Sequence, residues 1–457
     1  MPVCVNSDYN LRNFLKQLAP SLVLFALWCL YVVAYYPGYM TFDSKVHFDQ
    51  VMSGGWTTFQ PVVFLGLWKL THTLIAGPAG MFLLLLSVFS LGVHLFVNTL
   101  GIKWWQKVLA VVVVMLAPVN VMLLPHVWKD IALLAFLMLS LGLFQKSIQS
   151  SNRVLKVMAL ISLGLAMSFR FEAVLYLWPM VFYFVWPTSN GLDTSRKYLI
   201  VRTGVKTMAF IAVVFVSNAL MSQISGAKKI TLWPTMALWD LAAVSIEVDE
   251  NLLPAFVSGP SMTVEDLTQA FEPWSNVPLF SRTKAGINTG IDLPYSDEQY
   301  QTLRQTWLQL PFNHSQAYIK HRWRVMMELL RINESKDSPV ALYYNHTMSK
   351  YNGTYPKNDS QANVKIEQVL KAAVKGFYSK PWFYLLLGML AVPLLLKKQG
   401  GQCKWQSSGL ARALTACIVL NVLVMLFLAP AAESRYLIVG MNFSLLLWFF
   451  VFSTDPS

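Results

Sequence analysis

Long apolar runs separated by short polar segments dominate the hydrophobic pattern of this chain. The runs fall near residues 20–36, 79–99, 108–124, 131–144, 157–169, 173–186, 207–222, 381–396, 413–430 and 436–453. A membrane-spanning helix needs roughly 17–25 residues, so the shorter runs must include flanking residues. Residues 60–76 are also apolar, but Lys69 and His72 interrupt them. We predict an all-α polytopic membrane protein with about ten transmembrane helices. Residues 60–76 are expected to form a re-entrant or juxtamembrane helix on the outer side.

The composition supports a membrane protein. The 457 residues are 55% hydrophobic and only 13% charged, with a mean hydropathy of +0.47, whereas soluble domains average about 25% charged residues. In a soluble protein the net charge of +13 would indicate a nucleic-acid partner. Here the basic residues gather in short loops, among them residues 103–107, 146–156 and 196–206, as they do in cytoplasmic loops of membrane proteins. We therefore expect the lipid bilayer, and no nucleic acid, as a partner.

The same basic loops set the orientation and the number of spans. When the N-terminus is inside, these loops all face the cytoplasm. If residues 60–76 crossed the membrane, every later loop would be inverted and the basic clusters would face outward, against the positive-inside rule. The charges therefore favour ten spans, with residues 60–76 kept on the outer side.

Acidic and basic residues occur together at the predicted outer ends of the helices. The clusters are Asp43 with Lys45 and Asp49, Lys129 with Asp130, Arg170 with Glu172, and Glu433 with Arg435. Ionisable groups at membrane depth are costly and usually mark a polar cavity. Any one of these clusters is also compatible with ordinary ion pairing at the interface. Four clusters on one face favour a shared site.

The remaining chain divides into three parts. Residues 1–222 are expected to form an N-terminal transmembrane bundle with a first external loop at residues 37–61, and residues 381–457 the C-terminal transmembrane helices. Residues 223–380 form a hydrophilic segment that is too long for a passive loop. We predict an external, mainly α-helical domain there. Ser296 and Gln299 fit a capping box at the start of one of its helices.

A helix predicted over residues 315–331 places one charge among apolar residues. Ile319, Trp323 and Met326 lie on its apolar stripe, and Arg322 falls inside that sector. A buried Arg needs an anion. The anion is either a carboxylate of the same segment or a phosphate, which suits the forked donors of a guanidinium. The sequence leaves both interpretations open.

The sequence lacks a Walker A loop, a Gly-rich dinucleotide turn and a pair of His residues at metal-binding spacing. ATP-driven transport and nucleotide-sugar chemistry are therefore disfavoured. A carboxylate with several cations on one membrane face suits glycosyl transfer from a lipid phosphate, because a base must deprotonate the acceptor and cations must stabilise the leaving phosphate. Asp43 is the candidate base. The candidate phosphate ligands are Lys129, Arg170, Arg322 and Arg435, and Asp49, Asp130 and Glu172 are candidates to orient them or to bind sugar.

Several segments resemble the GT-C superfamily of membrane glycosyltransferases, which use polyprenyl-phosphate sugars. The chain from Pro37-Gly38 through Asp43 to Gln60-Pro61 is similar to their first external loop, although many members have a His or Lys before paired prolines. The other similar segments are Trp128-Lys129-Asp130, Phe169-Arg170-Phe171-Glu172, Leu238-Trp239-Asp240-Leu241-Ala242, Tyr318-Ile319-Lys320-His321-Arg322 and Glu433-Ser434-Arg435-Tyr436-Leu437. Each is short, but together they span the chain in order.

The resemblance implies a GT-C-like bundle that transfers a hexose such as glucose from a polyprenyl-phosphate donor to a cell-surface glycan or lipid-linked acceptor. It implies an integral protein of the bacterial inner membrane with its site on the periplasmic face, in the manner of enzymes that modify O-antigen or other lipopolysaccharide. It adds Asp240 and Glu433 to the substrate-binding residues. No metal ligand is identified, and a divalent metal cofactor is left open. A flippase and a polyprenyl-phosphate glycosyltransferase are the implied partner proteins.

Two other classes remain as alternatives. A transporter or flippase of lipid-linked sugars or polysaccharide should carry charges along a path that reaches both faces, whereas the charges here stop at one face. A membrane acyltransferase or phosphoethanolamine-type transferase should carry a reactive His or a metal site, and neither stands out in the sequence.

Overall fold

The computed structural model describes residues 6–187, 195–258, 262–282, 286–291, 293–333, 351, 353–355, 360–399 and 405–453. The structure is 78% helix, and these ranges include no β-strand. The all-α prediction is therefore confirmed.

Within the described ranges, six helices are long and apolar enough to cross a membrane. They are α1 (Asn6–Tyr35), α4 (Ala79–Thr99), α7 (Lys129–Ser150), α10 (Arg196–Ile224), α20 (Trp405–Leu428) and α21 (Ile438–Phe452), the last taken together with the turn η2 (Ser434–Leu437). Shorter apolar helices accompany them: α3 (Val62–Leu74), α5 (Trp104–Leu116), α9 (Ala173–Val185) and α19 (Pro381–Gln399). The protein is thus a multi-pass membrane protein in its helix content, and the count of ten spans remains a prediction.

One predicted span is broken. Residues 108–124 were expected to form a single run, but α5 ends at Leu116 and a short helix, α6 (Pro118–Leu123), follows. Between them, Ala117 has φ −51° and ψ 129°. The ring of Pro118 disfavours the helical conformation at the preceding residue, which explains the break.

Glycines bring the central helices together. α7 lies between α4 and α8 (Arg153–Phe169) and packs along both. A Cβ on Gly92 would lie 2.4 Å from the backbone of Leu139, and one on Gly142 would lie 2.6 Å from the carbonyl oxygen of Gly92. Small residues allow such close helix contact in membranes, so α4 and α7 pack closely against each other at the centre of the bundle.

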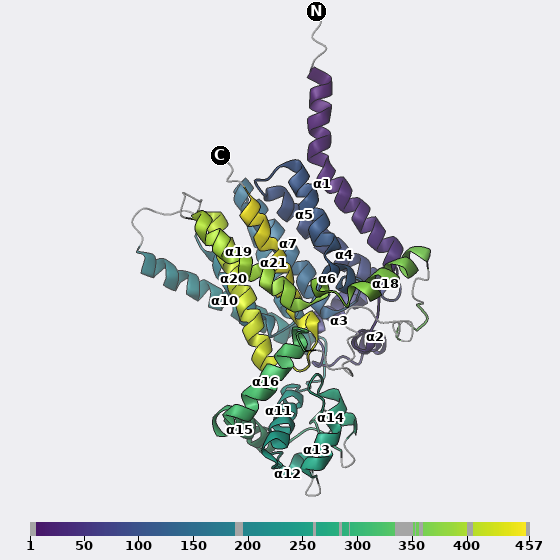
Figure 1. Cartoon of the computed structure of the whole chain (residues 1–457), viewed down its shortest axis with the longest axis vertical. Coiled ribbons are helices and arrows are strands. Elements are labelled where there is room, and N and C mark those ends of the chain that lie inside the picture. Colours follow the sequence, from purple (N-terminus) through teal and green to yellow (C-terminus); the bar gives the residue numbers. More distant parts are fainter. Residues whose placement is uncertain are drawn as a thin grey trace, which may run out of the picture.

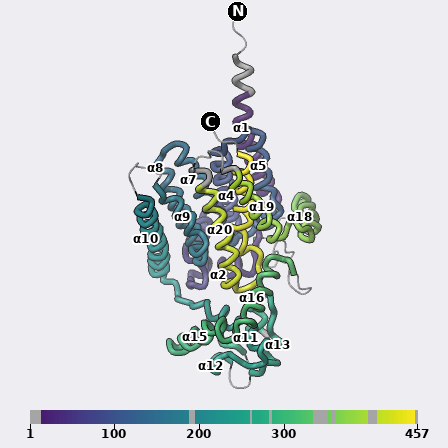
Figure 2. The backbone as a smooth tube through the Cα atoms, turned by 60° about the vertical axis from the view of Figure 1, so that its left-hand side comes forward, coloured from purple at the N-terminus to yellow at the C-terminus, as the bar shows by residue number. Residues whose placement is uncertain are grey.

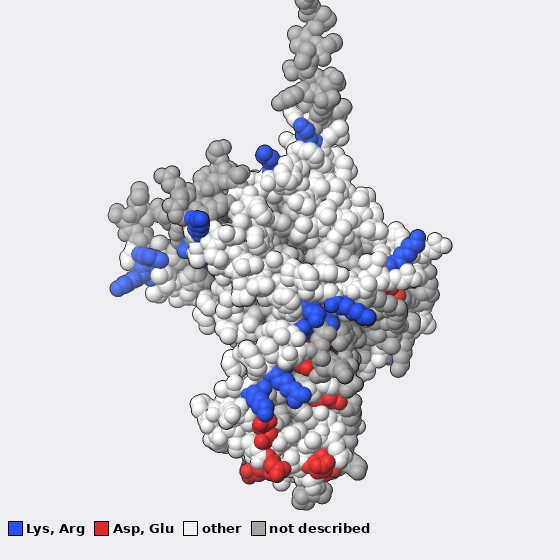
Figure 3. Space-filling model, in the orientation of Figure 1, with Lys and Arg blue, Asp and Glu red and all other residues white. Residues whose placement is uncertain are grey.

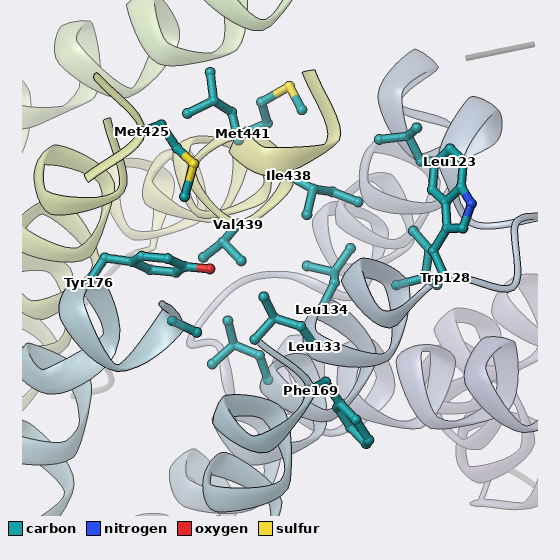
Figure 4. Packing of buried hydrophobic residues seen from close by; sticks show 14 of the residues in the cluster. Leu123, Trp128, Leu133, Leu134, Phe169, Tyr176, Met425, Ile438, Val439 and Met441 are labelled. Carbon is teal, nitrogen blue, oxygen red and sulfur yellow. The ribbon is translucent and has the colours of Figure 1, made fainter. Parts of the chain in front are cut away.

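The core continues from α7 toward the C-terminal helices. Figure 4 shows Leu133 and Leu134 of α7 facing Ile438 and Val439 of α21, with Tyr176 of α9 beside them. All five side chains are buried. These residues lie within a few positions of the polar residues that end the same helices, so the apolar packing fixes where those polar residues meet.

A separate lobe lies at the end of the bundle away from the chain termini (Figures 1 and 2). It consists of α11 (Trp233–Val248), α12 (Ala255–Ser258), α13 (Val264–Ala270), α14 (Val277–Arg282), α15 (Asp297–Asn313) and α16 (Ser315–Leu329). The capping box of Ser296 and Gln299 is confirmed, because each side chain accepts the other's backbone N–H.

The segment 223–380 is divided between the lobe and the side of the bundle. Helix α18 (Gln361–Ala373) does not join the lobe. It packs against α1, where Asn363 donates from Nδ2 to the carbonyl of Ala34 at 2.8 Å and to the Tyr39 hydroxyl at 2.6 Å. Its position follows from these buried polar contacts, which give α18 a fixed place beside the first external loop.

Surface charge differs between the two ends of the molecule. On the face shown in Figure 3, the Asp and Glu residues gather mainly on the lobe, while the opposite end of the bundle displays Lys and Arg among the residues drawn. This polarity matches a positive-inside arrangement in which the lobe is external.

Candidate active site

The first external loop is tied to the start of α7. Gly38 turns the chain with φ 96°, a conformation that suits glycine, and a Cβ there would lie 2.7 Å from Phe82. The next residue, Tyr39, accepts a hydrogen bond from Val127 N at 3.0 Å and donates its own N–H to Pro125 O at 2.8 Å. Thr41 then caps α2 (Phe42–Ser53). The first turn of α2, which carries Asp43, is thereby held near the start of α7.

Arg435 joins the first loop to the last. Its Nη2 atom donates to Asp43 Oδ2 at 2.5 Å, and its Nε faces Glu433 in a second ion pair. The guanidinium lies over the ring of Trp128, 4.6 Å from the centroid. Trp128 in turn donates to Thr41 Oγ1 at 2.7 Å. Asp43 is 42% exposed in this pair and Arg435 only 8%, so the carboxylate keeps an open side.

Arg170 forms the second half of the same cluster. It pairs with Asp130 and with Glu172, and its guanidinium lies 4.5 Å from the centroid of the Tyr436 ring. Arg435 also lies over that ring, at 5.7 Å. Tyr436 therefore connects the two guanidinium groups, and the four predicted outer clusters contribute to one site.

Lys129 is the cation of this cluster that forms no ion pair within the described residues. It is half-buried, and the nearest polar partner of its Nζ is Gln60 Oε1 at 3.5 Å. Among the described residues no carboxylate oxygen comes within 4.0 Å of it. A half-buried ammonium without an ion pair is suited to an incoming anion.

Besides the Arg435 Nε that faces Glu433, three buried polar atoms at the site have no hydrogen-bond partner in the part of the chain that the structure describes. They are His47 Nε2, His126 Nε2 and Asp130 Oδ2. Buried polar groups are nearly always satisfied. Each of these atoms therefore has the capacity for one further hydrogen bond. A carboxylate oxygen such as Asp130 Oδ2 can accept a hydrogen bond from an incoming hydroxyl group.

The residues around Asp43 control its protonation. Burial opposes ionisation, but the Arg435 guanidinium, helped by Lys129 and His47, lowers the pKa of Asp43 to about 2. Glu433 behaves in the opposite way, since burial outweighs the attraction of Arg435 and raises its pKa. The two carboxyl groups on one guanidinium thus differ in proton affinity, and Asp43 has the lower pKa.

His47 is held neutral. Burial, with Lys129 nearby, lowers the pKa of His47 from 6.5 to about 4. Its Nδ1 donates to the backbone carbonyl of Asp43, and its ring lies edge-on to Phe64 at 5.1 Å. The neutral histidine therefore stabilises the first turn of α2 through its hydrogen bond to the Asp43 carbonyl.

We expect the protein to lose stability on acidification below pH 6.5. Between about pH 6.5 and pH 4 the unfolded chain binds a proton at His47 that the folded protein does not. The free energy of unfolding therefore begins to fall when the pH drops below about 6.5, the pKa of His47 in the unfolded chain. His47→Asn keeps an amide donor for the Asp43 carbonyl but does not titrate. Thermal unfolding in detergent at pH 7 and pH 5 should show a smaller drop in Tm for the variant. An equal drop would contradict a neutral buried His47.

Asp49 does not join the cluster. It lies about 120° around α2 from Asp43, is 58% exposed and pairs with Lys45 at 2.5 Å. The prediction that it binds substrate is not supported by this position, because six helical positions turn it toward solvent.

The interpretation of Arg322 as a phosphate ligand is corrected. Arg322 pairs with Asp240 inside the lobe, and the side chains are 1% and 0% exposed. Asp240 also accepts a hydrogen bond from Trp307 Nε1 at 2.8 Å. Burial opposes ionisation of Asp240, but Arg322 and His321 hold its pKa below the usual range. The anion that Arg322 required is this carboxylate, so neither residue is available to a substrate.

Sequence reasoning left several site residues unassigned. His47 and Gln60 were visible in the first loop without a role. Tyr436 appeared only as part of a segment that resembles the GT-C family, and His126 carried no signal, because an isolated His beside an apolar run resembles any packed residue. No group of three or more His, Cys, Asp or Glu side chains able to hold a metal ion is found within the described ranges.

The chain matches no protein-family model, no curated protein and no solved structure at the level required of a match. Its function is therefore argued from the geometry of the site.

Proposed function

We propose that this protein is a GT-C-type glycosyltransferase that transfers a hexose from a polyprenyl-phosphate donor to a glycan or lipid-linked acceptor. The observation that carries this proposal is the meeting of one partly open carboxylate, Asp43, with the cations Lys129, Arg170 and Arg435 at the ends of apolar helices. A lipid phosphate would lie at this depth, where its chain stays in the bilayer and its charged head reaches the cations.

The donor phosphate would bind Lys129 and Arg435. Because it competes with Asp43 for the Arg435 guanidinium, it would raise the proton affinity of the carboxylate when the donor is in place. Asp43 then accepts the proton of the acceptor hydroxyl. The acceptor oxygen forms a bond to the anomeric carbon while the bond from that carbon to the phosphate oxygen breaks. Polyprenyl phosphate leaves with the electron pair, stabilised by the same cations.

Other residues would bind the sugar. Asp130 and Glu172 are held by Arg170, so their oxygens are fixed in position, and Asp130 Oδ2 has no partner within the described residues. Both carboxylates can accept sugar hydroxyls. The polarity of surface charge supports an external lobe and a site on the periplasmic face of a bacterial inner membrane.

The direct test is a transfer assay in proteoliposomes. The purified protein would be supplied with synthetic polyprenyl-phosphate glucose, galactose or mannose, with lipopolysaccharide as the acceptor. We expect labelled sugar on the acceptor and release of polyprenyl phosphate in equal amounts. Movement of intact donor across the bilayer without its cleavage would instead support a transporter of lipid-linked sugars and would overturn the proposal.

Lys129→Gln should weaken binding of polyprenyl phosphate by roughly 10- to 100-fold, because a hydrogen bond to a charged group contributes about 1.5–3 kcal/mol. The fold should be kept, since Lys129 compensates no carboxylate directly. Binding is measured by titrating the lipid into protein in nanodiscs. Lys45→Gln is the control: Lys45 is exposed on α2 and pairs with Asp49. Equal losses in the two variants would show a general charge effect.

A further inference from the structure

Residues 429–433, here called the linking loop, join α20 to η2 and lead directly to Arg435. The lobe holds the start of this loop. Arg322 Nη1 donates to the carbonyl oxygen of Ala429 at 2.9 Å, while Nη2 of the same guanidinium pairs with Asp240. His321 Nε2 lies 3.1 Å from the other oxygen of Asp240. The guanidinium of Arg322 is therefore held in place by Asp240 at Nη2, and its Nη1 binds the backbone of the linking loop.

The lobe also holds the rest of the linking loop. Ala432 donates its N–H to the carbonyl of Trp274 at 2.8 Å, and the neighbouring Ser275 and Ala431 form an isolated antiparallel bridge. Beyond the loop, Ser434 Oγ donates to the carbonyl of Leu329, the last residue of α16, at 3.2 Å. Contacts from two separate parts of the lobe thus fix a short segment of backbone.

The linking loop meets the active site immediately afterwards. Glu433 ends the loop and Arg435 follows two residues later, so any displacement of the backbone at residues 429–433 moves the guanidinium that reaches Asp43. The Arg435–Asp43 contact at 2.5 Å joins α2 and η2, whereas the lobe contacts approach the loop from α16 and the segment before α14.

We propose that Arg322 is a positioning residue that acts through the linking loop on Arg435. Its buried pairing with Asp240 makes it a rigid strut between the lobe and the site. The inference rests on the proposed function, because Arg435 matters to transfer only if it serves the donor and the base. It assigns the lobe a role in catalysis that needs no contact with the substrate.

Arg322→Lys tests this role with little disturbance of the charge. Lysine keeps the positive charge beside Asp240, but a single ammonium does not reproduce the fork that reaches both Asp240 and Ala429. We expect kcat for transfer to fall roughly tenfold, because small misplacements of reacting groups are costly, with the donor KM changed much less. We also expect faster hydrogen–deuterium exchange in the peptide that contains residues 429–437.

The pH profile separates positioning from simple loss of stability. Asp43 faces Arg435, Lys129 and His47, and Glu433 shares its guanidinium. When Arg435 moves away, the proton affinity of Asp43 rises, so the acid limb of kcat/KM should shift to higher pH in Arg322→Lys. Leu303→Ala is the matched control, since it removes a buried apolar side chain of α15 that takes no part in these hydrogen bonds. It should lower Tm without moving the acid limb.

Ser434→Ala is a second variant that should fold normally, because it removes only one hydroxyl. It should increase exchange in the same peptide and lower kcat in the same direction by a smaller factor. If Arg322→Lys changes neither the exchange of residues 429–437 nor the acid limb while wild-type transfer is intact, the positioning role is wrong. If exchange increases but wild-type protein transfers no sugar from any of the tested donors, the strut exists and the proposed function is wrong.

Discussion

Asp43→Asn is expected to lower the rate of sugar transfer by about 100- to 10,000-fold, the range that positioned general bases contribute. Asparagine has the shape of the carboxylate and still accepts a hydrogen bond from Arg435, but it does not take the proton of the acceptor hydroxyl. Donor binding should be retained or improved, since the variant no longer competes with the phosphate as a charge. The measurement is transfer in proteoliposomes beside a separate titration with polyprenyl phosphate.

Asp49→Asn is the matched control on the same helix. Asp49 is exposed and its partner is Lys45, so transfer should stay within about twofold of wild type, as expected of a surface substitution. Normal turnover in Asp43→Asn together with a large loss in Asp49→Asn would show that Asp49, and not Asp43, is the catalytic base. Normal turnover in both variants would remove the first external loop from the chemistry.

Arg435→Gln is expected to reduce transfer by roughly 100- to 1,000-fold, a loss similar to that of one donor to a developing oxyanion. It should also change the pH profile. In wild type the pKa of Asp43 is about 2, so this carboxylate is ionised throughout the range from pH 4 to pH 9. Without the guanidinium, burial raises that pKa, and activity should fall on the acid side at a higher pH than in wild type.

The control for Arg435→Gln is Arg324→Gln. Arg324 lies on the exposed side of α16, so its removal changes the net charge equally but leaves the site intact. The pH profile is measured as kcat/KM from pH 4 to pH 9. If kcat/KM of Arg435→Gln depends on pH in the same way as that of wild type, Arg435 does not act on the protonation of Asp43, whatever the loss in rate.

The helices and their charged ends could be predicted from sequence because both depend on local pattern. Length and hydropathy are enough to identify α4 or α7, and the polar residues that end them lie next to the runs. The pairing of Asp43 with Arg435 could not be predicted, because hydrophobic periodicity does not say which helix ends are neighbours. The same holds for Asp240 and Arg322, which lie 82 residues apart.

The helix that carries Arg322 shows the limit of periodicity. The burial of Arg322 was predicted correctly. The apolar stripe was predicted correctly only in part: Met326 is buried, but Ile319 and Trp323 are 61% and 58% exposed. Arg322 lies on the inner face of α16 because its partner Asp240 is buried there. The face of α16 that packs against the lobe is therefore set by this ion pair as well as by apolar side chains. Residue type alone predicts that Ile and Trp are buried. It does not show that Arg322 has a buried carboxylate as its partner.

The contact between Asp43 and Arg435 joins residues 392 positions apart. A ribosome that adds roughly 5–20 residues per second needs about 20–80 s to travel from one to the other. Throughout that time Asp43 lacks its guanidinium partner. The pair is therefore completed only after the turn η2, which carries Arg435, has been synthesised. Under the proposed function, a polypeptide released before residue 435 would keep most of its membrane helices but lack this guanidinium, so interrupted translation would yield no active transferase.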